Sequence, residues 1–274
     1  MRTHGIRIFA IWLVLTIIAE VFIGVVPVPS PVGSDEALGA HQTVYMLFYV
    51  AAPFFTFVWA MLIYNVVVFR RRGGDTGDGP PVSDSTPALL IWAAISFTAV
   101  VFLAGWGTFT LHEITQADGP NTQHIQVIGQ QWIWTYRYPQ FGGAESDVLV
   151  LPVKHSVEFD ITSLDVVHSL WIRDLDIKED AVPGVVNHAF LFARHTASSN
   201  QAGNNWVVCN ELCGLYHGYM RSRMRIVPYA AWQAWGKALE AHERANGLLK
   251  TLPKYSSKYF PPPVVPPAPQ DQST

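Results

Sequence analysis

Three long apolar stretches limit the fold of this chain more than any other feature of its sequence. They run over residues 8–26, 44–69 and 88–111. A helix of roughly 20 apolar residues is long enough to cross the hydrocarbon core of a membrane. The composition agrees, since 50% of the 274 residues are hydrophobic and only 14% are charged. We therefore predict two or three transmembrane helices, with residues 44–111 forming a helical hairpin.

The charges that flank these stretches predict their direction. Arginines precede the first stretch and follow the second, at positions Arg2, Arg7 and 70–72. The segment between those two stretches contains Asp35 and Glu36 but no Lys or Arg. By the positive-inside rule, the 70–87 loop faces the cytoplasm and everything after Leu111 faces outward. We expect an integral protein of a bacterial cell membrane, with its second half on the periplasmic or extracellular side.

Residues 1–43 allow two interpretations. A basic start, an apolar run and the small residues at 37–40 fit a cleaved signal peptide. The length of the run and Glu20 within it favour a retained transmembrane helix. In both cases the side of the membrane that holds the outward domain stays the same.

The sequence after Gly119-Pro120 changes to short β-type runs separated by turn residues. Strands are expected at 124–130, 132–138, 148–153, 156–163, 170–172, 187–194, 206–208 and 222–227. Eight short strands in such a length favour a two-sheet sandwich over residues 120–228. A helix is expected from Tyr229 to about Leu249, within 229–250, and residues 251–274 form a Pro-rich tail.

One loop carries most of the chemically informative residues. Within twelve residues the sequence supplies two thiols, an imidazole and a thioether, from Cys209, Cys213, His217 and Met220. Another imidazole, His168, opens an apolar run about forty residues upstream. Thiolate and thioether ligands select copper or zinc, and imidazole suits both metals.

These residues allow several kinds of site. One Cys, two His and a Met suffice for a mononuclear blue-copper centre, which leaves the second thiolate unused. Two thiolates on one loop can instead bridge two copper ions, each of which takes one imidazole. The same residues also fit a Cys209–Cys213 disulfide on the oxidising side of the membrane, or a zinc site. We favour the dinuclear copper site, because it uses both thiolates and shares one electron over two metals, which suits fast electron transfer.

The sequence disfavours a nucleic-acid partner and an attached c-type haem. A net charge of −3 argues against a nucleic-acid partner, which favours a basic surface. The sequence has no C-x-x-C-H motif, so no c-type haem is attached to it. The remaining histidines have no ligand-like spacing and are interpreted as ordinary polar or packed residues: His4, His41, His112, His124, His155, His188, His195 and His242.

The motif C-x-E-x-C-x-x-x-H-x-x-M, with an upstream His and behind a membrane hairpin, resembles subunit II of the haem–copper cytochrome c oxidases. The resemblance covers about residues 44–228 and implies an all-β, cupredoxin-like sandwich that holds the dinuclear copper centre called CuA. The implied copper ligands are His168, Cys209, Glu211 (through its backbone carbonyl), Cys213, His217 and Met220. The Glu211 side chain is further implied to reach a Mg²⁺ or Mn²⁺ ion at the boundary with subunit I, since hard cations favour oxygen ligands.

A second segment, GQQWIWTYRY at 129–138, is similar to the aromatic segment of the same family. There the first Trp admits electrons from cytochrome c, which implies that role for Trp132. The alternative is that these aromatic residues only pack within a sheet. One departure from the family is Leu89, where an acidic residue usually helps to admit protons.

The resemblance implies a subunit that takes electrons from cytochrome c and passes them to the haem–copper subunit I. Subunit I then reduces O₂ to water with proton translocation, and subunit III is a further partner. Carboxylates at Glu145, Asp147, Asp174, Asp176, Glu179 and Asp180 are candidates for guiding a basic cytochrome c. The alternatives are the CuA subunit of a nitric oxide reductase and, in a different class, a membrane-anchored copper-binding protein.

Overall fold

The computed structural model describes residues 2–26, 33–70, 85–115, 121–199 and 206–248. The chain divides into two compact units. One unit comprises Met1–Pro29 and Ala40–His112, and the other comprises Ser30–Gly39 and Glu113–Thr274.

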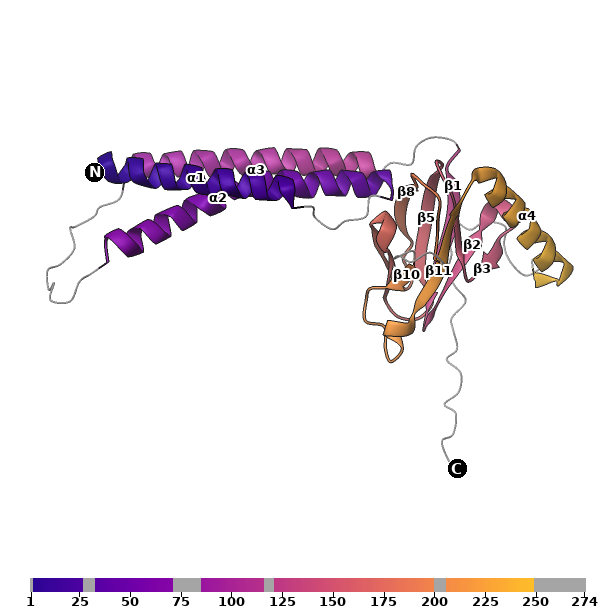
Figure 1. Ribbon diagram of the computed structural model, residues 1–274. Coiled ribbons are helices and arrows are strands. Elements are labelled where there is room, and N and C mark those ends of the chain that lie inside the picture. Colours follow the sequence, from indigo (N-terminus) through magenta and orange to yellow (C-terminus); the bar gives the residue numbers. More distant parts are fainter. Residues whose placement is uncertain (1, 27–32, 71–84, 116–120, 200–205, 249–274) are drawn as a thin grey trace, which may run out of the picture. The chain divides into compact units, whose positions relative to one another are not determined.

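The first unit is helical. Its helices are α1 (Arg2–Val25), α2 (Asp35–Val68) and α3 (Thr86–Ile114), drawn in indigo to magenta in Figure 1. All three are long and apolar enough to cross a membrane, by length and composition. The prediction of two or three membrane helices ahead of a β-domain is confirmed.

Side-chain hydrogen bonds join α1 to α2. The indole Nε1 of Trp12 donates to the backbone carbonyl of Pro53 at 2.8 Å. The hydroxyl groups of Thr16 and Thr56 lie 2.7 Å apart. Polar groups in the hydrocarbon region need such partners, because lipid supplies none. The carbonyl of the proline inside α2 thus has a donor from the neighbouring helix.

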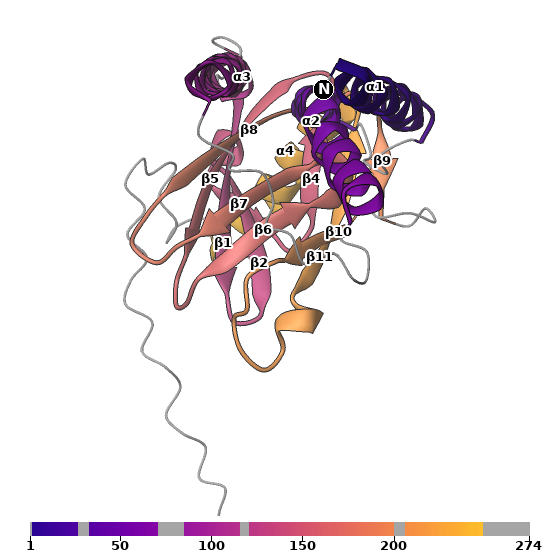
Figure 2. The ribbon, with the colours of Figure 1, turned by 90° about the vertical axis from the view of Figure 1, so that its left-hand side faces the viewer.

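The second unit is a β-sandwich of two sheets, as Figures 1 and 2 show. The first sheet has the order β3-β2-β1-β5-β8, from Ala144–Ser146, Ile133–Tyr138, Gln123–Gln130, Ser156–Ser163 and Asn187–Phe192. The second has the order β4-β11-β10-β6-β7, from Leu149–Pro152, Arg221–Val227, Trp206–Cys209, His168–Ile172 and Ile177–Ala181, and β9 (Ala197–Ser198) pairs with β11. The pairs β1–β5 and β4–β11 are parallel, and the other pairs are antiparallel. The predicted two-sheet sandwich is confirmed.

Alternating side chains build the core between the sheets. Along β11 every second residue is buried, as expected for a strand with one face in the core. Ile125 and Phe159 contribute from the first sheet, and Leu170 and Ile226 from the second; all four are at most 2% exposed.

The helix α4 (Tyr229–Ala245) packs against the sandwich. Its Trp232 is buried and donates from Nε1 to the carbonyl of Val150 at 3.0 Å. A Cβ at Gly236 would lie 2.0 Å from the ring of Phe141, so only glycine allows the helix to approach this closely.

The element boundaries differ from the sequence predictions in several places. The described residues contain eleven strands, and β3, β7 and β9 were not predicted. The strand expected to start at Trp132 starts at Ile133, and the one expected at Leu170 already starts at His168. Helix α4 ends at Ala245 instead of about Leu249, just before Gly247 with a φ of 75°. The Pro-rich tail lies outside the described residues.

Candidate metal centre

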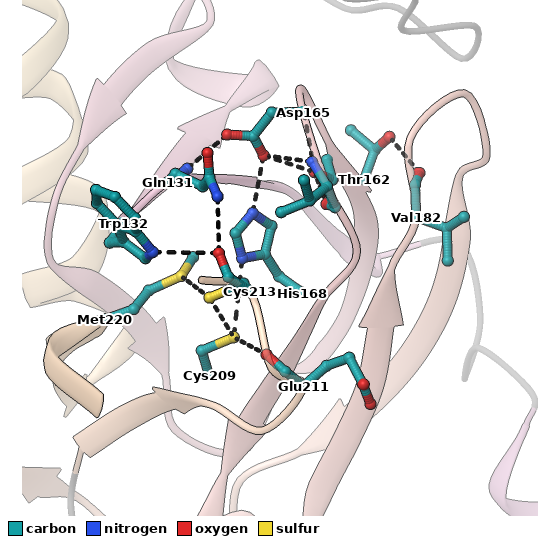
Figure 3. Close-up of polar contacts among 12 residues, drawn as sticks. Gln131, Trp132, Thr162, Asp165, His168, Val182, Cys209, Glu211, Cys213 and Met220 are labelled. Carbon is teal, nitrogen blue, oxygen red and sulfur yellow. Dashed lines mark hydrogen bonds and ion pairs between the residues drawn. The ribbon is translucent and has the colours of Figure 1, made fainter. Parts of the chain in front are cut away.

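The ligand-type side chains predicted from the sequence come together at one end of the second sheet. Figure 3 shows His168, Cys209, Cys213 and Met220 among them. His168 is the first residue of β6 and Cys209 the last residue of β10, and these strands are neighbours. The chain after β10 then folds back, because the N–H of Cys209 donates to the carbonyl of Met220 at 3.0 Å. This bond closes the loop that carries Cys213 and His217.

Each thiol faces the other thiol and one imidazole. The two Sγ atoms lie 3.8 Å apart. His168 Nδ1 lies 3.8 Å from the sulfur of Cys209, and His217 Nδ1 lies 3.5 Å from the sulfur of Cys213. Met220 Sδ is 3.8 Å from Cys213 Sγ. The arrangement offers two bridging sulfurs with a separate imidazole on each side.

The cysteines are not joined in this structure. Both are free, and their sulfur separation is far above the roughly 2.05 Å of a disulfide bond. The two side chains point toward each other without forming a bond.

Glu211 contributes through two different groups. Its backbone carbonyl lies 3.3 Å from Cys209 Sγ, beside the sulfur pair. Its side chain is exposed and points away from the sulfurs in Figure 3. The carbonyl and the carboxylate therefore face different surroundings.

Asp165 fixes the ring of His168. Its Oδ1 accepts from His168 Nε2 at 2.9 Å, and its Oδ2 accepts from the backbone N–H of Gln131 at 2.7 Å. With Nε2 used as the donor, Nδ1 faces Cys209 with its lone pair, as a metal-binding imidazole requires. Burial by itself raises the pKa of Asp165, but the hydrogen bonds from Gln131 and His168 lower it below its ordinary value.

Close approach of the His168 ring also requires a glycine. A Cβ at Gly129 would lie 3.0 Å from the His168 ring and 3.1 Å from the ring of Trp134. His168 itself is fully buried. A larger residue at position 129 would displace one of the two rings.

The two thiols differ in acidity. Burial raises the pKa of Cys209, but the hydrogen bond with His168 and backbone hydrogen bonds at Glu211 and Ser169 outweigh it and lower that pKa to about 6. Burial and the charge on Cys209 together raise the pKa of Cys213 to about 12. Two adjacent thiolates repel each other unless a cation lies between them, so the pair suits a site that a metal ion completes.

The donor set fits copper. His168, Cys209 and Cys213 form a buried group whose ligand atoms all lie within 4.8 Å of one another. Soft sulfur and imidazole donors select copper, zinc or iron–sulfur clusters over Mg²⁺ and Ca²⁺. The addition of a thioether, Met220, which is 1% exposed, favours copper within that group.

Trp132 is hydrogen-bonded to the same loop. Its Nε1 donates to the carbonyl of Cys213 at 3.2 Å, and Gln131 Nε2 donates to that carbonyl at 2.8 Å. The half-buried indole also meets Tyr216 edge to face, with ring centroids 4.8 Å apart. Only one hydrogen bond separates the indole from a residue that carries one of the two sulfurs.

Sequence reasoning missed Asp165 and Gln131. Asp165 lies three residues before His168, which is the spacing that lets a side chain reach back within a turn. Gln131 precedes the Trp that was singled out, but a lone amide in a polar turn gives no signal of its own.

The chain is similar to several known proteins. Residues 143–227 match the model of a family described as cytochrome c oxidase subunit II, periplasmic domain. Cytochrome c oxidase subunit 2 of Thermostichus vulcanus is 26% identical over 244 residues, covering 70% of this chain and 72% of the relative. Cytochrome c oxidase subunit 2 of a Synechocystis species is 25% identical over 285 residues, covering 87% of this chain and 82% of the relative. Among solved structures, the periplasmic domain of subunit II of the Bradyrhizobium japonicum cytochrome oxidase is 26% identical, with a TM-score of 0.41, covering 47% of this chain and 98% of that domain.

Fold and site together define a membrane-anchored β-sandwich protein that gathers two thiols, two imidazoles and a thioether at one end of a sheet. Residues 143–227 match the family of cytochrome c oxidase subunit II periplasmic domains, and over longer alignments the chain is similar to proteins named cytochrome c oxidase subunit 2.

Proposed function

We propose that the chain is the electron-entry subunit of a terminal cytochrome c oxidase and holds dinuclear copper (CuA). The proposed ligands are His168, Cys209, the backbone carbonyl of Glu211, Cys213, His217 and Met220. The observation that carries the proposal is the pair of sulfurs 3.8 Å apart, each with its own imidazole nitrogen. When bound, the copper pair would supply a one-electron site shared between two ions.

The protein buries four of the proposed ligand side chains, those of His168, Cys209, Cys213 and Met220. Cys213 and Met220 are at most 3% exposed, and His168 is fixed by Asp165. A site that is already arranged changes little when its charge changes, which favours rapid one-electron transfer.

Trp132 is the proposed entry point for electrons from cytochrome c. The indole is half-buried, so one part of it can meet a partner protein while its Nε1 bonds to the carbonyl of Cys213. The family resemblance and this contact both support the role.

Exposed apolar side chains on the cysteine loop and beside Trp132 on β2 provide a docking surface. The loop that carries Cys213 and His217 exposes Leu212, Leu215, Tyr216 and Tyr219, and β2 exposes Ile133. Tyr216 contacts the indole of Trp132 directly. A patch of this kind on a soluble domain marks a protein-interaction site, and we assign it to cytochrome c.

Of the carboxylates considered for steering cytochrome c, Glu145 already has a partner. One of its oxygens lies 3.8 Å from Arg137 Nε. Asp147, Asp176 and Asp180 are exposed and remain candidates for long-range attraction.

The remaining assignments follow from the subunit II family. The exposed carboxylate of Glu211 is proposed to bind Mg²⁺ or Mn²⁺ at the boundary with subunit I, the haem–copper subunit that reduces O₂ with proton translocation. Subunit III is the other proposed partner. The β-domain is proposed to face the periplasm or the outside of a bacterial cell.

The proposed domain limits keep the organisation inferred from sequence. Residues 1–43 are an N-terminal hydrophobic segment and outer loop, 44–111 the helical hairpin, and 120–228 the CuA domain. Residues 229–250 contain the C-terminal helix, and 251–274 form the Pro-rich tail.

Purification of the tagged full-length chain from its native membrane tests this function. We expect it to co-purify with a haem-containing subunit and to support O₂ consumption driven by reduced cytochrome c. In the double variant Cys209→Ser/Cys213→Ser the haem subunit should still co-purify, while O₂ consumption is lost. Absence of a haem partner, or undiminished O₂ consumption by the double variant, would contradict the proposal.

A further inference from the structure

A second cluster of metal-binding side chains lies on the other sheet, away from the sulfur ligands. It comprises His124 on β1, Glu158 and Asp160 on β5, and His188 on β8. In the sheet register His124 lies opposite Glu158, and Asp160 lies opposite His188. None of these residues belongs to the candidate copper site, and the sequence analysis interpreted both histidines as ordinary polar residues.

Strand geometry explains why the four side chains meet. Successive residues of a strand point to opposite faces of its sheet. Ile125 and Phe159, which follow His124 and Glu158, are fully buried in the core. The cluster therefore occupies the opposite face of the β1-β5-β8 part of the first sheet, whose strands lie side by side in Figure 1.

The imidazole nitrogens of the cluster lie within ion-pair distance of its carboxylate oxygens. His188 Nδ1 lies 3.0 Å from Asp160 Oδ1 and 3.2 Å from Glu158 Oε1. His124 Nδ1 lies 3.5 Å from Glu158 Oε2. Ligands bound tetrahedrally at about 2.0–2.1 Å from a zinc ion are about 3.3 Å from one another. The ligand atoms of His124, Glu158 and Asp160 all lie within 4.8 Å of one another, and His188 joins this group through its contacts with the two carboxylates.

Asp160 supplies an independent indication that the cluster can take a cation. It is 7% exposed, yet its Oδ2 has no hydrogen-bond partner among the parts of the chain that the structure describes. A buried carboxylate oxygen without a partner is costly, and a bound cation would satisfy it. Burial raises the pKa of Asp160 even though the adjacent His188 lowers it.

We propose that His124, Glu158, Asp160 and His188 form a second metal site, which binds a divalent transition-metal ion of the Zn²⁺ type. Two imidazoles with carboxylate oxygens are a ligand set that zinc accepts, while Mg²⁺ and Ca²⁺ prefer oxygen ligands alone. The site contains no sulfur and so is chemically different from the copper site. The histidine side chains are 38% and 52% exposed, which gives an ion a path from solvent to the buried carboxylates.

Zinc binding to the purified full-length chain tests this proposal. Equilibrium dialysis against Zn²⁺ alone, with metal counted by mass spectrometry, compares the parent with His188→Ala. We expect the variant to hold one zinc ion fewer per chain, and any zinc held by the thiols cancels in the difference. The matched control His242→Ala removes an exposed histidine from α4 and should leave the count unchanged.

A second variant guards against a folding defect. Glu158→Gln keeps the shape of the side chain and removes its charge, and we expect it to weaken zinc binding by at least roughly tenfold, as loss of a direct ligand should exceed the loss of an outer-shell partner. A Zn²⁺ count that is equal in the parent, His188→Ala and Glu158→Gln chains would overturn the proposal. So would a parent chain that binds no zinc. Neither result depends on the copper site or on electron transfer.

Discussion

Cys209 is the residue on which the proposed dinuclear copper site depends most. Its sulfur contacts His168, the carbonyl of Glu211 and Cys213. In Cys209→Ser the bridging thiolate is lost, and a hydroxyl is a poor ligand for copper. We predict that the variant holds at most one copper ion per chain and has no electron shared between two metals, with the β-domain still folded. Metal analysis, electron paramagnetic resonance and circular dichroism measure these properties, and an unchanged copper spectrum would contradict the assignment.

Asp165 acts through His168. An asparagine side chain has one oxygen and one NH₂ group, so in Asp165→Asn it can accept from only one of the two donors. Either the bond from Gln131 N–H or the bond from His168 Nε2 is lost. We predict copper binding weaker by about 10- to 100-fold, the usual cost of losing an outer-shell partner. Competition with a copper chelator measures the affinity.

Asp147→Asn is the matched control for this change, because Asp147 is an exposed aspartate of the same domain. Its copper affinity should equal that of the parent. Equal affinities in Asp165→Asn and Asp147→Asn would show that the bond to His168 does not support the site.

Trp132 is expected to affect the rate of electron entry and not the metal. Trp132→Phe removes the bond to the Cys213 carbonyl and part of the aromatic surface, while the sulfur ligands stay in place. We predict that reduction by cytochrome c slows by at least tenfold, equivalent to roughly 1.4 kcal/mol in the barrier. Stopped-flow kinetics at unchanged copper content is the measurement.

Trp235→Phe provides the same chemical change at another partly buried tryptophan, one that packs on Tyr138. It should leave the reduction rate unchanged. If both variants reduce as fast as the parent, Trp132 is not the entry point.

Ligand residues that share one loop can be predicted from the sequence, whereas residues that meet only through the fold cannot. The close spacing of Cys209, Cys213, His217 and Met220 is visible directly, since one short loop carries them. His124 and His188 gave no signal, because 64 positions separate them and only the β1-β5-β8 sheet brings them together. Spacing along the chain cannot reveal residues that meet through strand pairing.

At the scale of elements, the long apolar helices and the strongly alternating strands were predictable and three short strands were not. Strand β7 has the sequence IKEDA, whose charged residues have little preference for strands. It forms because its backbone pairs with β6 at the edge of the second sheet. Trp132, predicted in a strand, lies instead in the turn before β2. Gln130 pairs with Ile133 across the hairpin, which leaves Gln131 and Trp132 as its turn, whereas in β7 tertiary pairing overrides local preference.

The close packing of α4 on the sandwich can be tested by mutation of Gly236. In Gly236→Ala the new Cβ would lie 2.0 Å from Phe141, so the helix or the ring must shift. Overpacking of this kind costs about 1–3 kcal/mol. Replacing Gly by Ala in a helix gains about 1 kcal/mol in helix propensity, so the upper part of the overpacking range exceeds this gain. We predict a lower thermal unfolding midpoint of the β-domain, measured by near-ultraviolet circular dichroism.

Ala238→Leu is the control, since it adds a larger side chain at an exposed position of the same helix. Its effect on stability should stay within about 0.5 kcal/mol. A midpoint for Gly236→Ala at or above that of the parent would mean that α4 packs less tightly on Phe141 than the structure indicates.

At the scale of the whole molecule, a helical unit suited to a membrane carries a β-sandwich suited to a metal site. Both were expected from the change in sequence pattern near Gly119-Pro120. The sandwich keeps His168 on one strand and the cysteine loop on its neighbour, so the ligands meet through the second sheet. Pairing of these two strands brings His168 and Cys209, which are 41 positions apart in the sequence, into one site.

The central claim is that this site holds two copper ions that share one electron. Reconstitution of the purified full-length chain with copper, followed by metal counting and electron paramagnetic resonance, tests it most directly. The account predicts two copper ions per chain and a spectrum of one unpaired electron spread equally over both. One copper ion per chain, or none with Cys209 and Cys213 joined in a disulfide even after reduction, would contradict it.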